Sequence, residues 1–410
     1  MDIRPILSTL RRHKTASALI VLEIALTCAI ICNALFLISD RLAQIHEVSG
    51  IAENELVRVQ ITSIGKDDDE VPRTRSDLAA LRAIPGVRQA TITNQVPFVN
   101  SSWNSGVQLA KDQQQPTLVA TSYMADEHFL DTFGLKLVAG RGFESGEYIE
   151  YEDFDKPDAK IAIPAAIITE KMAQKLFPGQ NAVGKSFYSW GDQPIRVVGV
   201  VEHLVRPSQL GGPEGREYSM IFPLRPHYNV GGNYVIRVDP ARRQEVLAAA
   251  KKALLANGAD RIVLDDSSKT FEDLRHEYYQ APRSMAWLLG IVCVALLLIT
   301  ALGIVGLASF WVQQRTKQIG VRRALGATRG QILRYFQTEN FLLATLGIVL
   351  GMIGAYAINQ LLMGKYELPR LPLLYLPIGA LALWLLGQAS VLGPARRAAA
   401  VPPAVATRSI

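Results

Sequence analysis

The sequence predicts four transmembrane helices joined by a helical stalk to an α+β domain outside the membrane. Two observations lead to this fold class. Hydrophobic residues make up 49% of the chain and charged residues 20%, so apolar and polar residues must be segregated into blocks. Four blocks are apolar, and each reaches the roughly 20 residues that a helix needs to cross hydrocarbon. These blocks are residues 16–38, 284–312, 341–363 and 371–392.

The distribution of charge predicts the orientation in the membrane. Residues 1–15 hold four bases and one acid, and residues 313–334 hold six bases and no acid. Residues 40–283 hold 28 bases and 33 acids. Because Lys and Arg are retained on the cytosolic side during insertion, both termini are predicted inside and residues 40–283 outside. The net positive charge therefore belongs to the cytosolic rim, which argues against a nucleic-acid partner.

The first elements are a cytosolic helix and a stalk. Residues 1–15 are predicted to form an interfacial helix, because apolar and basic side chains separate onto two sides. After the first span, apolar residues recur at intervals of three and four up to Gly50, and the same spacing runs from Phe271 to Met285. Such heptad spacing is typical of paired helices. The predicted stalk segments are residues 39–50 and 271–283.

The exterior domain is predicted to span residues 51–270 and to contain two lobes. Strand–helix–strand patterns within 56–93 and 233–265 favour a split ferredoxin-like unit. Asp239 and Gly258 are the expected start and stop signals of its second helix. The first lobe comprises residues 51–94 and 233–270, and the inserted second α+β lobe comprises residues 95–232.

The loop after the second span carries the most specific pattern. Residues 313–334 read QQRTKQIGVRRALGATRGQILR and combine bases with apolar residues at helical spacing, which is typical of amphipathic turns at a membrane surface. Gly320, Gly326 and Gly330 are predicted to divide this loop into short pieces. Residues 313–340 are therefore predicted to dock a cytosolic partner.

The remaining spans suit close packing more than conduction. Gly347, Gly351 and Gly354 form a small-residue face on the third span. Polar residues are sparse in the spans, and Glu23, which is costly to bury in lipid, is predicted to face a helix partner or the interface. This sparseness favours a membrane part that transmits movement. The short outer loop is predicted at residues 364–370, and the cytosolic tail at residues 393–410.

Patterns for enzymatic chemistry are weak. Residues 179–186 match a phosphate-loop pattern, but a predicted helix precedes them and a strand follows, so a turn is expected. The acidic run 144–158 lacks the ligand spacing of a calcium loop, which favours a solvated loop. All three cysteines lie in spans, so the exterior domain should have neither disulfides nor thiolate metal sites. We expect no catalytic site and no metal site.

In this order the motifs resemble an FtsX-like permease of the MacB type, a class of ABC transporters that work by mechanotransmission. The similarity covers almost the whole chain. The stretch QQRTKQIGVRRALGATRGQI looks like the family's cytosolic coupling segment. The family's periplasmic core domain is similar to YMADEHFLDTFGLKLVAGRGF, AAIITEKMAQKLFPGQNAVGKSF and IRVVGVVEHL, and its C-terminal signature is similar to GPARRAAAVPPAVA.

The resemblance implies an inner-membrane permease subunit with no enzymatic activity and no cofactor of its own. ATP and magnesium would be bound by a separate cytosolic ABC ATPase subunit. The other implied partners are a second permease and membrane lipids, and a periplasmic adaptor and an outer-membrane channel stay open. The implied ATPase-coupling residues are Arg315, Lys317, Gln318, Ile319, Gly320, Arg322, Arg323, Ala324, Leu325, Gly326 and Ala327.

One departure from the family pattern and two other functions remain. Family members often carry acids where this chain has Gln314 and Gln318, which suggests the less active half of a heterodimer. The other functions are an FtsX-like signalling or scaffold protein that regulates an extracytoplasmic partner, and a lipoprotein-release permease. The signalling branch usually has a much smaller exterior domain than the roughly 230 residues predicted here, which favours export of a substrate.

Overall fold

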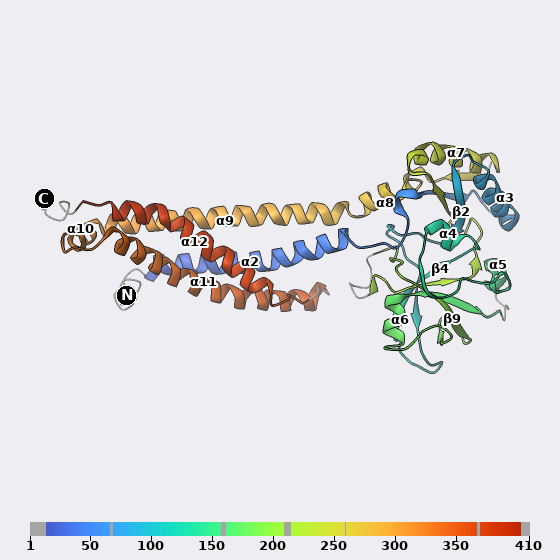
Figure 1. The fold of residues 1–410 in the computed structure, drawn as a ribbon, viewed down its shortest axis with the longest axis horizontal. Helices are drawn as coiled ribbons and strands as arrows, with labels where there is room; N and C mark the ends of the chain where they lie inside the picture. The colour runs from blue at the N-terminus through green and yellow to red at the C-terminus, as the bar shows by residue number, and fades with distance from the viewer. Residues whose placement is uncertain are drawn as a thin grey trace. The chain divides into compact units, whose positions relative to one another are not determined.

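The computed structural model describes residues 14–65, 69–156, 161–208, 215–258, 260–366 and 370–402. Two compact units make up the chain (Figure 1). The membrane unit combines Met1–His46 with Ala281–Ile410, and the exterior unit is Glu47–Gln280. Most of the predicted interfacial helix 1–15, the middle of the loop 364–370 and the end of the tail 393–410 lie outside the described residues.

Among the residues that the structure describes, the membrane unit has four helices that are long and apolar enough to cross a membrane, which agrees with the prediction. They are α2 (Lys14–Ile45), α9 (Gln280–Gln314), α11 (Arg329–Tyr366) and α12 (Tyr375–Ala399). A short helix, α10 (Thr316–Ala324), lies between α9 and α11. At 1.5 Å per residue α2 is about 48 Å long and α9 about 52 Å. Both exceed a hydrocarbon core of about 30 Å, so these helices also supply a stalk.

The heptad spacing has a different role from the one predicted. The side chains of Leu42 and Met285 are 44% and 45% exposed, so they are not buried in a helix seam. Residues Phe271–Tyr278 form a separate helix, α8, which belongs to the exterior unit. Phe271 is fully buried, and its ring lies 6.2 Å from the ring of Phe133. The apolar spacing before the second span therefore serves the core of the exterior unit.

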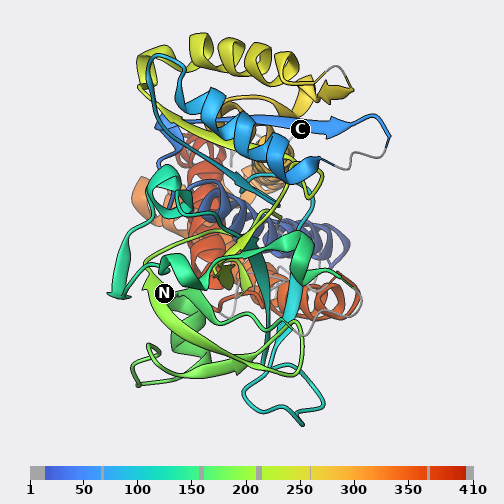
Figure 2. The ribbon, with the colours of Figure 1, turned by 90° about the vertical axis from the view of Figure 1, so that its right-hand side faces the viewer.

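The first lobe is a split ferredoxin-like sheet, as predicted. Its elements are β1 (Leu56–Ser63), α3 (Glu70–Arg82), β2 (Val87–Thr93), β12 (Asn233–Val238), α7 (Arg243–Ala256) and β13 (Arg261–Val263). The strand order is β13-β1-β12-β2, and all neighbours are antiparallel. The helices α3 and α7 pack side by side on this sheet (Figure 2). Alternate residues such as Val57, Val59 and Ile61 enter the core between sheet and helices.

Helix boundaries in this lobe follow local chemistry. The helix α3 begins at Glu70, earlier than the predicted residue 75, because Pro72 is tolerated in a first turn, where no helical N–H partner is needed. The carboxylate of Asp239 accepts from the N–H of Ala241 at 3.0 Å, as predicted for an N-cap. The first turn there is a 3₁₀ turn, Pro240–Arg242, and α7 follows it.

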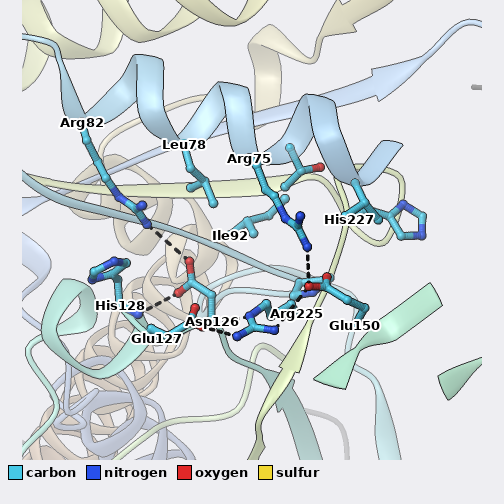
Figure 3. Close-up of a pocket in the computed structure, with 13 residues that line it drawn as sticks. Arg75, Leu78, Arg82, Ile92, Asp126, Glu127, His128, Glu150, Arg225 and His227 are labelled. Atoms are coloured by element: carbon cyan, nitrogen blue, oxygen red, sulfur yellow. Dashed lines mark hydrogen bonds and ion pairs between the residues drawn. The ribbon is translucent and has the colours of Figure 1, made fainter. Parts of the chain in front are cut away.

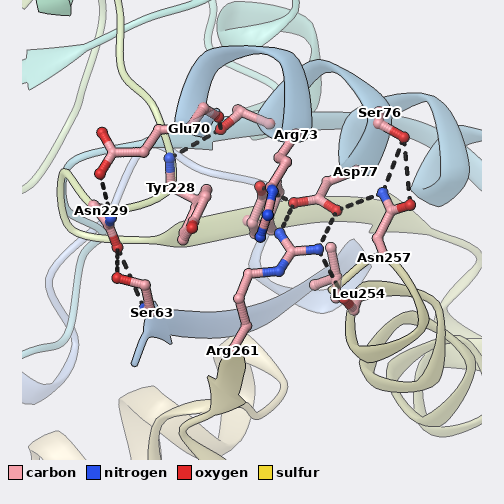
Figure 4. Close-up of polar contacts among 12 residues, drawn as sticks. Ser63, Glu70, Arg73, Ser76, Asp77, Tyr228, Asn229, Leu254, Asn257 and Arg261 are labelled. Atoms are coloured by element: carbon pink, nitrogen blue, oxygen red, sulfur yellow. Dashed lines mark hydrogen bonds and ion pairs between the residues drawn. The ribbon is translucent and has the colours of Figure 1, made fainter. Parts of the chain in front are cut away.

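A buried polar network joins the helices to the sheet (Figure 4). The carboxylate of Asp77 pairs with Arg261 at 2.5 and 3.1 Å, and it also accepts from Tyr234 at 2.6 Å and from Asn257 at 2.8 Å. Arg261 donates to the carbonyl of Leu254 at 3.0 Å. Every partner of this carboxylate is a donor, so its burial is compensated. Burial raises the pKa of Tyr234 well above its ordinary value.

The second lobe is an α+β unit built on a mixed sheet of seven strands. Its strand order is β3-β4-β10-β7-β9-β5, with β8 paired to β9. The strands are β3 (Asn104–Val107), β4 (Leu118–Met124), β5 (Leu137–Gly140), β7 (Ala165–Thr169), β8 (Ser186–Tyr188), β9 (Pro194–Val201) and β10 (Ser219–Phe222). The helices are α4 (Phe129–Phe133), α5 (Tyr151–Phe154) and α6 (Glu170–Leu176), and β6 (Ile149–Glu150) pairs with β11 (Leu224–Arg225).

Two motifs of this lobe have structural roles. The phosphate-loop pattern lies between α6 and β8 as a turn, with Gly179 and Gly184 at φ of +68° and +89°. Such left-handed values favour glycine, which explains both positions. Part of the acidic run is ion-paired: Arg141 bonds Glu147 at 2.8 Å, and Arg75 bonds Glu150 at 2.7 Å.

Candidate functional site

The turn between α10 and α11 is shaped by two capping motifs. Gly326, at φ +96°, donates to the carbonyl of Arg323 at 3.1 Å, and Ala327 donates to the carbonyl of Arg322 at 3.0 Å. This is a Schellman ending of α10. Thr328 and Gln331 then exchange hydrogen bonds of 2.9 and 3.2 Å, which form a capping box for α11. The turn is therefore a fixed local structure.

Only one of the three loop glycines ends a helix. Gly320 lies inside α10 and is buried, and Gly330 lies in the first turn of α11. The prediction that all three glycines divide the loop is therefore wrong at these two positions. The cost of a glycine in a helix is about 1 kcal/mol, which the packing of α10 and the capping box of α11 can offset.

A buried ion pair anchors the segment to the membrane unit. The Nη1 atom of Arg315 lies 3.1 and 3.0 Å from the two carboxylate oxygens of Glu339 on α11. The Arg315 and Glu339 side chains are 10% and 1% exposed. The guanidinium also lies 5.5 Å above the ring of Trp311, within reach of a cation–π interaction. This contact joins the end of α9 to the start of α11.

The predicted coupling residues divide into an inner and an outer set. Arg315, Ile319 and Gly320 are buried, and Arg323 and Ala327 are half-buried. Val321 and Leu325 are 48% and 83% exposed, and they share one face of α10 because they are four residues apart. The other exposed members are Lys317, Gln318, Arg322, Ala324 and Gly326. The outer face thus presents apolar side chains beside bases.

Glycines on α11 allow close approach to α2. A Cβ atom on Gly347 would lie 2.8 Å from Cβ of Ile24 and 2.9 Å from the carbonyl oxygen of Val21. At Gly351 it would lie 2.5 Å from Cβ of Cys28. At Gly354 the nearest atom is an ordinary 3.8 Å away. Gly347 and Gly351 thus allow a contact that a larger residue would prevent.

Polar residues in the spans bond between helices. Thr27 and Thr300 pair through their hydroxyls at 2.9 Å, joining α2 to α9. Asn33 donates to the carbonyl of Ala355 at 3.1 Å, and Trp384 donates to Thr345 at 3.0 Å. The Glu23 carboxylate lies against Gly303 of α9, where a Cβ atom would come within 2.7 Å of it. These groups hold the helices together.

A second cluster fastens the two chain ends of the exterior unit. Arg275 of α8 pairs with Glu53 and donates to the carbonyl of Glu47 at 2.7 Å. Its guanidinium lies 5.3 Å above the ring of Phe98 and 5.7 Å above that of Tyr279. We call Glu47, Glu53, Phe98, Arg275 and Tyr279 the root cluster. It ties the segment after α2 to the helix before α9.

The sequence reasoning missed Glu339 and Arg275. Glu339 lies at the edge of an apolar span, and its signal was that it is an acid close to a strongly basic loop. Arg275 had no local signal, because Glu47 and Glu53 are more than 200 residues away in sequence. No group of three or more His, Cys, Asp or Glu could hold a metal ion in the part of the chain that the structure describes.

The fold and the segment define a membrane-spanning permease with a large periplasmic α+β domain. The family model of the FtsX-like permease C-terminal part matches residues 290–403. That of the MacB-like periplasmic core domain matches residues 17–254. The chain therefore belongs to the MacB-like family of ABC transporter permeases, and it is an inner-membrane protein.

Three similar proteins illustrate the range of the family. The permease YvrN of Bacillus subtilis is 22% identical over 90% of this chain and 89% of its own length. The macrolide export ATP-binding/permease protein MacB of Rhodospirillum rubrum is 27% identical over 62% of this chain but only 39% of its own length. The solved periplasmic region of MacB from Actinobacillus actinomycetemcomitans is 16% identical over 58% of this chain and 98% of its own, with a TM-score of 0.32.

Proposed function

We propose that this chain is the permease subunit of an exporter driven by a separate cytosolic ABC ATPase. The ATPase docks on the outer face of α10, and closure of the ATPase moves α10 with the ends of α9 and α11. The helices α2 and α9 relay this movement to the periplasmic domain, which acts on the exported substrate. Both termini are cytosolic in this proposal.

The observation that carries the proposal is the exposed apolar pair on α10. Val321 and Leu325 are exposed at the end of a helix fixed by the Schellman turn, with Arg322 beside them. Exposed apolar residues ringed by charge are typical of a protein interface. Arg315 and Glu339 connect this face to α9 and α11, so a force on α10 reaches both long helices.

Two further features support a relay. The interhelical bonds of the spans leave few polar groups to line a path for substrate, as the pair Thr27–Thr300 illustrates. The root cluster connects, through Arg275, the segment that follows α2 with the helix that precedes α9. Movement of either α2 or α9 would therefore act on the same cluster.

The docking step is tested by co-purification with the ATPase. We expect Val321→Asp/Leu325→Asp, and separately Arg322→Glu/Arg323→Glu, to abolish capture of the ATPase by the tagged permease. The matched control is Arg396→Glu/Arg397→Glu, because these arginines are exposed at the cytosolic end of α12. Capture unchanged by both segment variants would refute the proposal.

Export is distinguished from signalling by a transport assay. We expect a deletion strain to accumulate substrate and inverted vesicles with both subunits to take it up with ATP. ATPase binding without any transport would favour the signalling or scaffold function, and release of lipoproteins would favour the lipoprotein-release function.

We also infer that the second permease of the complex is a different chain. Gln314 and Gln318 are exposed at the segment where family members often carry acids. Charge pairing with the ATPase is weaker without these acids. Gln314→Glu/Gln318→Glu should therefore raise ATPase stimulation. A homodimer of this chain with full stimulation would contradict the inference. Lipid and the second permease would cover the exposed face of α9, where Trp287 is 76% exposed.

A further inference from the structure

A cavity of about 360 Å³ lies within the exterior unit, between its two lobes (Figure 3). One wall is a face of α3, and the floor includes Ile92 of β2, an outer strand of the first lobe's sheet. The facing wall comes from the second lobe and the chain after β11. The lining residues used below are Arg75, Leu78, Arg82, Ile92, Asp126, Glu127, Glu150 and Arg225. This volume falls in the range of small-molecule sites, about 300–1,000 Å³.

The charges of the cavity balance each other. Among the described residues, three arginines and three carboxylates line it. Arg82 lies 3.6 Å from Asp126, and Arg75 lies 2.7 Å from Glu150. Arg225 bridges Glu150 at 3.3 Å and Glu127. A ligand with a net charge would leave one of these groups uncompensated, whereas a ligand with one positive and one negative group can exchange partners and keep the balance.

One end of the cavity is fixed and the other can open. Arg82 donates twice to the carbonyl of Ala90, at 3.2 and 2.7 Å, and Asp126 accepts from Thr91 and from the N–H of His128 at 3.1 Å. At the other end the Arg75 side chain is 67% exposed. Exposed ion pairs contribute little to stability, so a ligand can replace the contact between Arg75 and Glu150.

Apolar side chains separate these two ends. Leu78 of α3 and Ile92 of β2 lie between the pair Arg82–Asp126 and the pair Arg75–Glu150 (Figure 3). A bound molecule would therefore meet charge at the open end and an apolar surface beside it.

We propose that this cavity binds a small zwitterion of peptide type, whose ammonium and carboxylate groups are carried on an apolar body. The carboxylate pairs with Arg75 and the ammonium with Glu150, while the apolar body covers Leu78 and Ile92. Because Arg75 belongs to the first lobe and Glu150 to the second, the ligand links the two lobes. The site goes beyond the proposed function and requires no ATPase.

Calorimetry with the full chain in detergent tests this proposal. The probe is the dipeptide leucyl-leucine, and the comparison ligands are N-acetyl-leucyl-leucine and leucyl-leucinamide, which each lack one charge. We expect leucyl-leucine to bind and each blocked form to bind at least tenfold more weakly. Equal affinity for the three ligands, or no heat of binding up to about 10 mM dipeptide, would overturn the proposal.

Variants locate the binding to this cavity. Arg75→Gln and Glu150→Gln should each weaken leucyl-leucine binding at least fivefold, and a thermal melt verifies that each variant is folded. The matched control is Arg141→Gln, which breaks the pair Arg141–Glu147 in the same unit but outside the cavity. Unchanged binding in both cavity variants, or an equal loss in the control, would count against this site.

Discussion

Each unit of the molecule contains a buried arginine–carboxylate pair, and the two pairs are built differently. In the exterior unit Asp77 accepts from Arg261, Tyr234 and Asn257, and the Asp77 and Arg261 side chains are 0% and 1% exposed. In the membrane unit Arg315 reaches Glu339 through Nη1, beside a small cavity of about 40 Å³. The first pair is enclosed by its network, whereas Arg315 of the second pair also lines this small cavity.

This difference indicates how each unit uses its pair. A carboxylate that accepts from several buried donors fixes one arrangement of helix and sheet, because any movement leaves a polar group unsatisfied. Because Arg315 lies at the break between α9 and α10 and lines a small cavity, its side chain has room to change its geometry. The exterior pair therefore fixes one arrangement of helix and sheet, whereas the membrane pair suits a place where two helices move relative to each other.

The largest expected effect is in the exterior unit. Arg261→Met leaves Asp77 buried without its cation, and we expect a loss of about 3–5 kcal/mol in the free energy of unfolding. Urea unfolding measures this loss, and hydrogen exchange of the α3 amides shows where in the unit it arises. Arg141→Gln, which breaks a surface pair, is the control and should leave the α3 exchange unchanged. A loss below 1 kcal/mol in Arg261→Met would contradict the stabilising role assigned to the buried pair of the exterior unit.

Asp126 tests a buried carboxylate with fewer donors. Burial raises the pKa of Asp126 from 3.8 to about 6, and Arg82, Thr91 and the N–H of His128 face it. The folded state thus binds this proton more tightly than the unfolded state between pH 4 and 6. Stability from this group is therefore present at low pH and lost as pH rises to about 6.

The corresponding measurement compares the wild type with Asp126→Asn. Relative to the variant, the wild type should lose about 2 kcal/mol of unfolding free energy between pH 4 and pH 7, since each pKa unit corresponds to about 1.4 kcal/mol and the unfolded carboxyl is already partly ionised at pH 4. Urea unfolding at both pH values measures it. Parallel pH profiles for the two proteins would show that Asp126 does not titrate in this range.

Packing in the membrane unit should be sensitive to a larger residue at Gly351. In Gly351→Val the new Cβ atom would lie 2.5 Å from Cβ of Cys28 and 2.6 Å from the carbonyl oxygen of Ala25. We expect a loss of about 1–3 kcal/mol from overpacking, seen as a lower melting temperature in detergent. Gly354→Ala is the control, since its nearest atom is 3.8 Å away. Equal melting temperatures for the two variants would contradict close packing of α2 on α11.

The smallest stability effect should come from the membrane pair. Arg315→Lys keeps the charge near Glu339 but loses the planar guanidinium over Trp311, at a cost of about 0.5–1 kcal/mol. The stimulation of the ATPase by this permease should fall more than the small loss of permease stability can explain. Arg396→Lys, at an exposed position of α12 outside the segment, is the control. If Arg315→Lys stimulates the ATPase as well as the wild type does, the Arg315–Glu339 pair does not transmit movement from α10 to the long helices.

The broad architecture could be predicted because it depends on local patterns. Apolar runs identified the four spans, and the two strand–helix–strand halves around 56–93 and 233–265 anticipated the ferredoxin-like order β13-β1-β12-β2. The prediction that residues 179–186 form a turn followed from the helix before them and the strand after them. In each case the signal lies within one stretch of chain.

What was missed depends on tertiary contacts. The spacing of Phe271 and Leu274 looked like a stalk seam, but both are buried in the exterior unit, so periodicity alone did not identify the partner surface. Gly320 is accommodated inside a helix, against its local preference. The root cluster and the inter-lobe cavity combine residues that are far apart in sequence, which no local pattern reveals.

Arg82 has a consequence for the behaviour of the protein in solution. Its guanidinium covers the carbonyl of Ala90 on β2, an outer strand of the first sheet. That carbonyl is buried, and α4 packs on β2 beside it. A buried carbonyl that loses its donor destabilises the folded state, so the loss of Arg82 would show as a less stable exterior unit in solution.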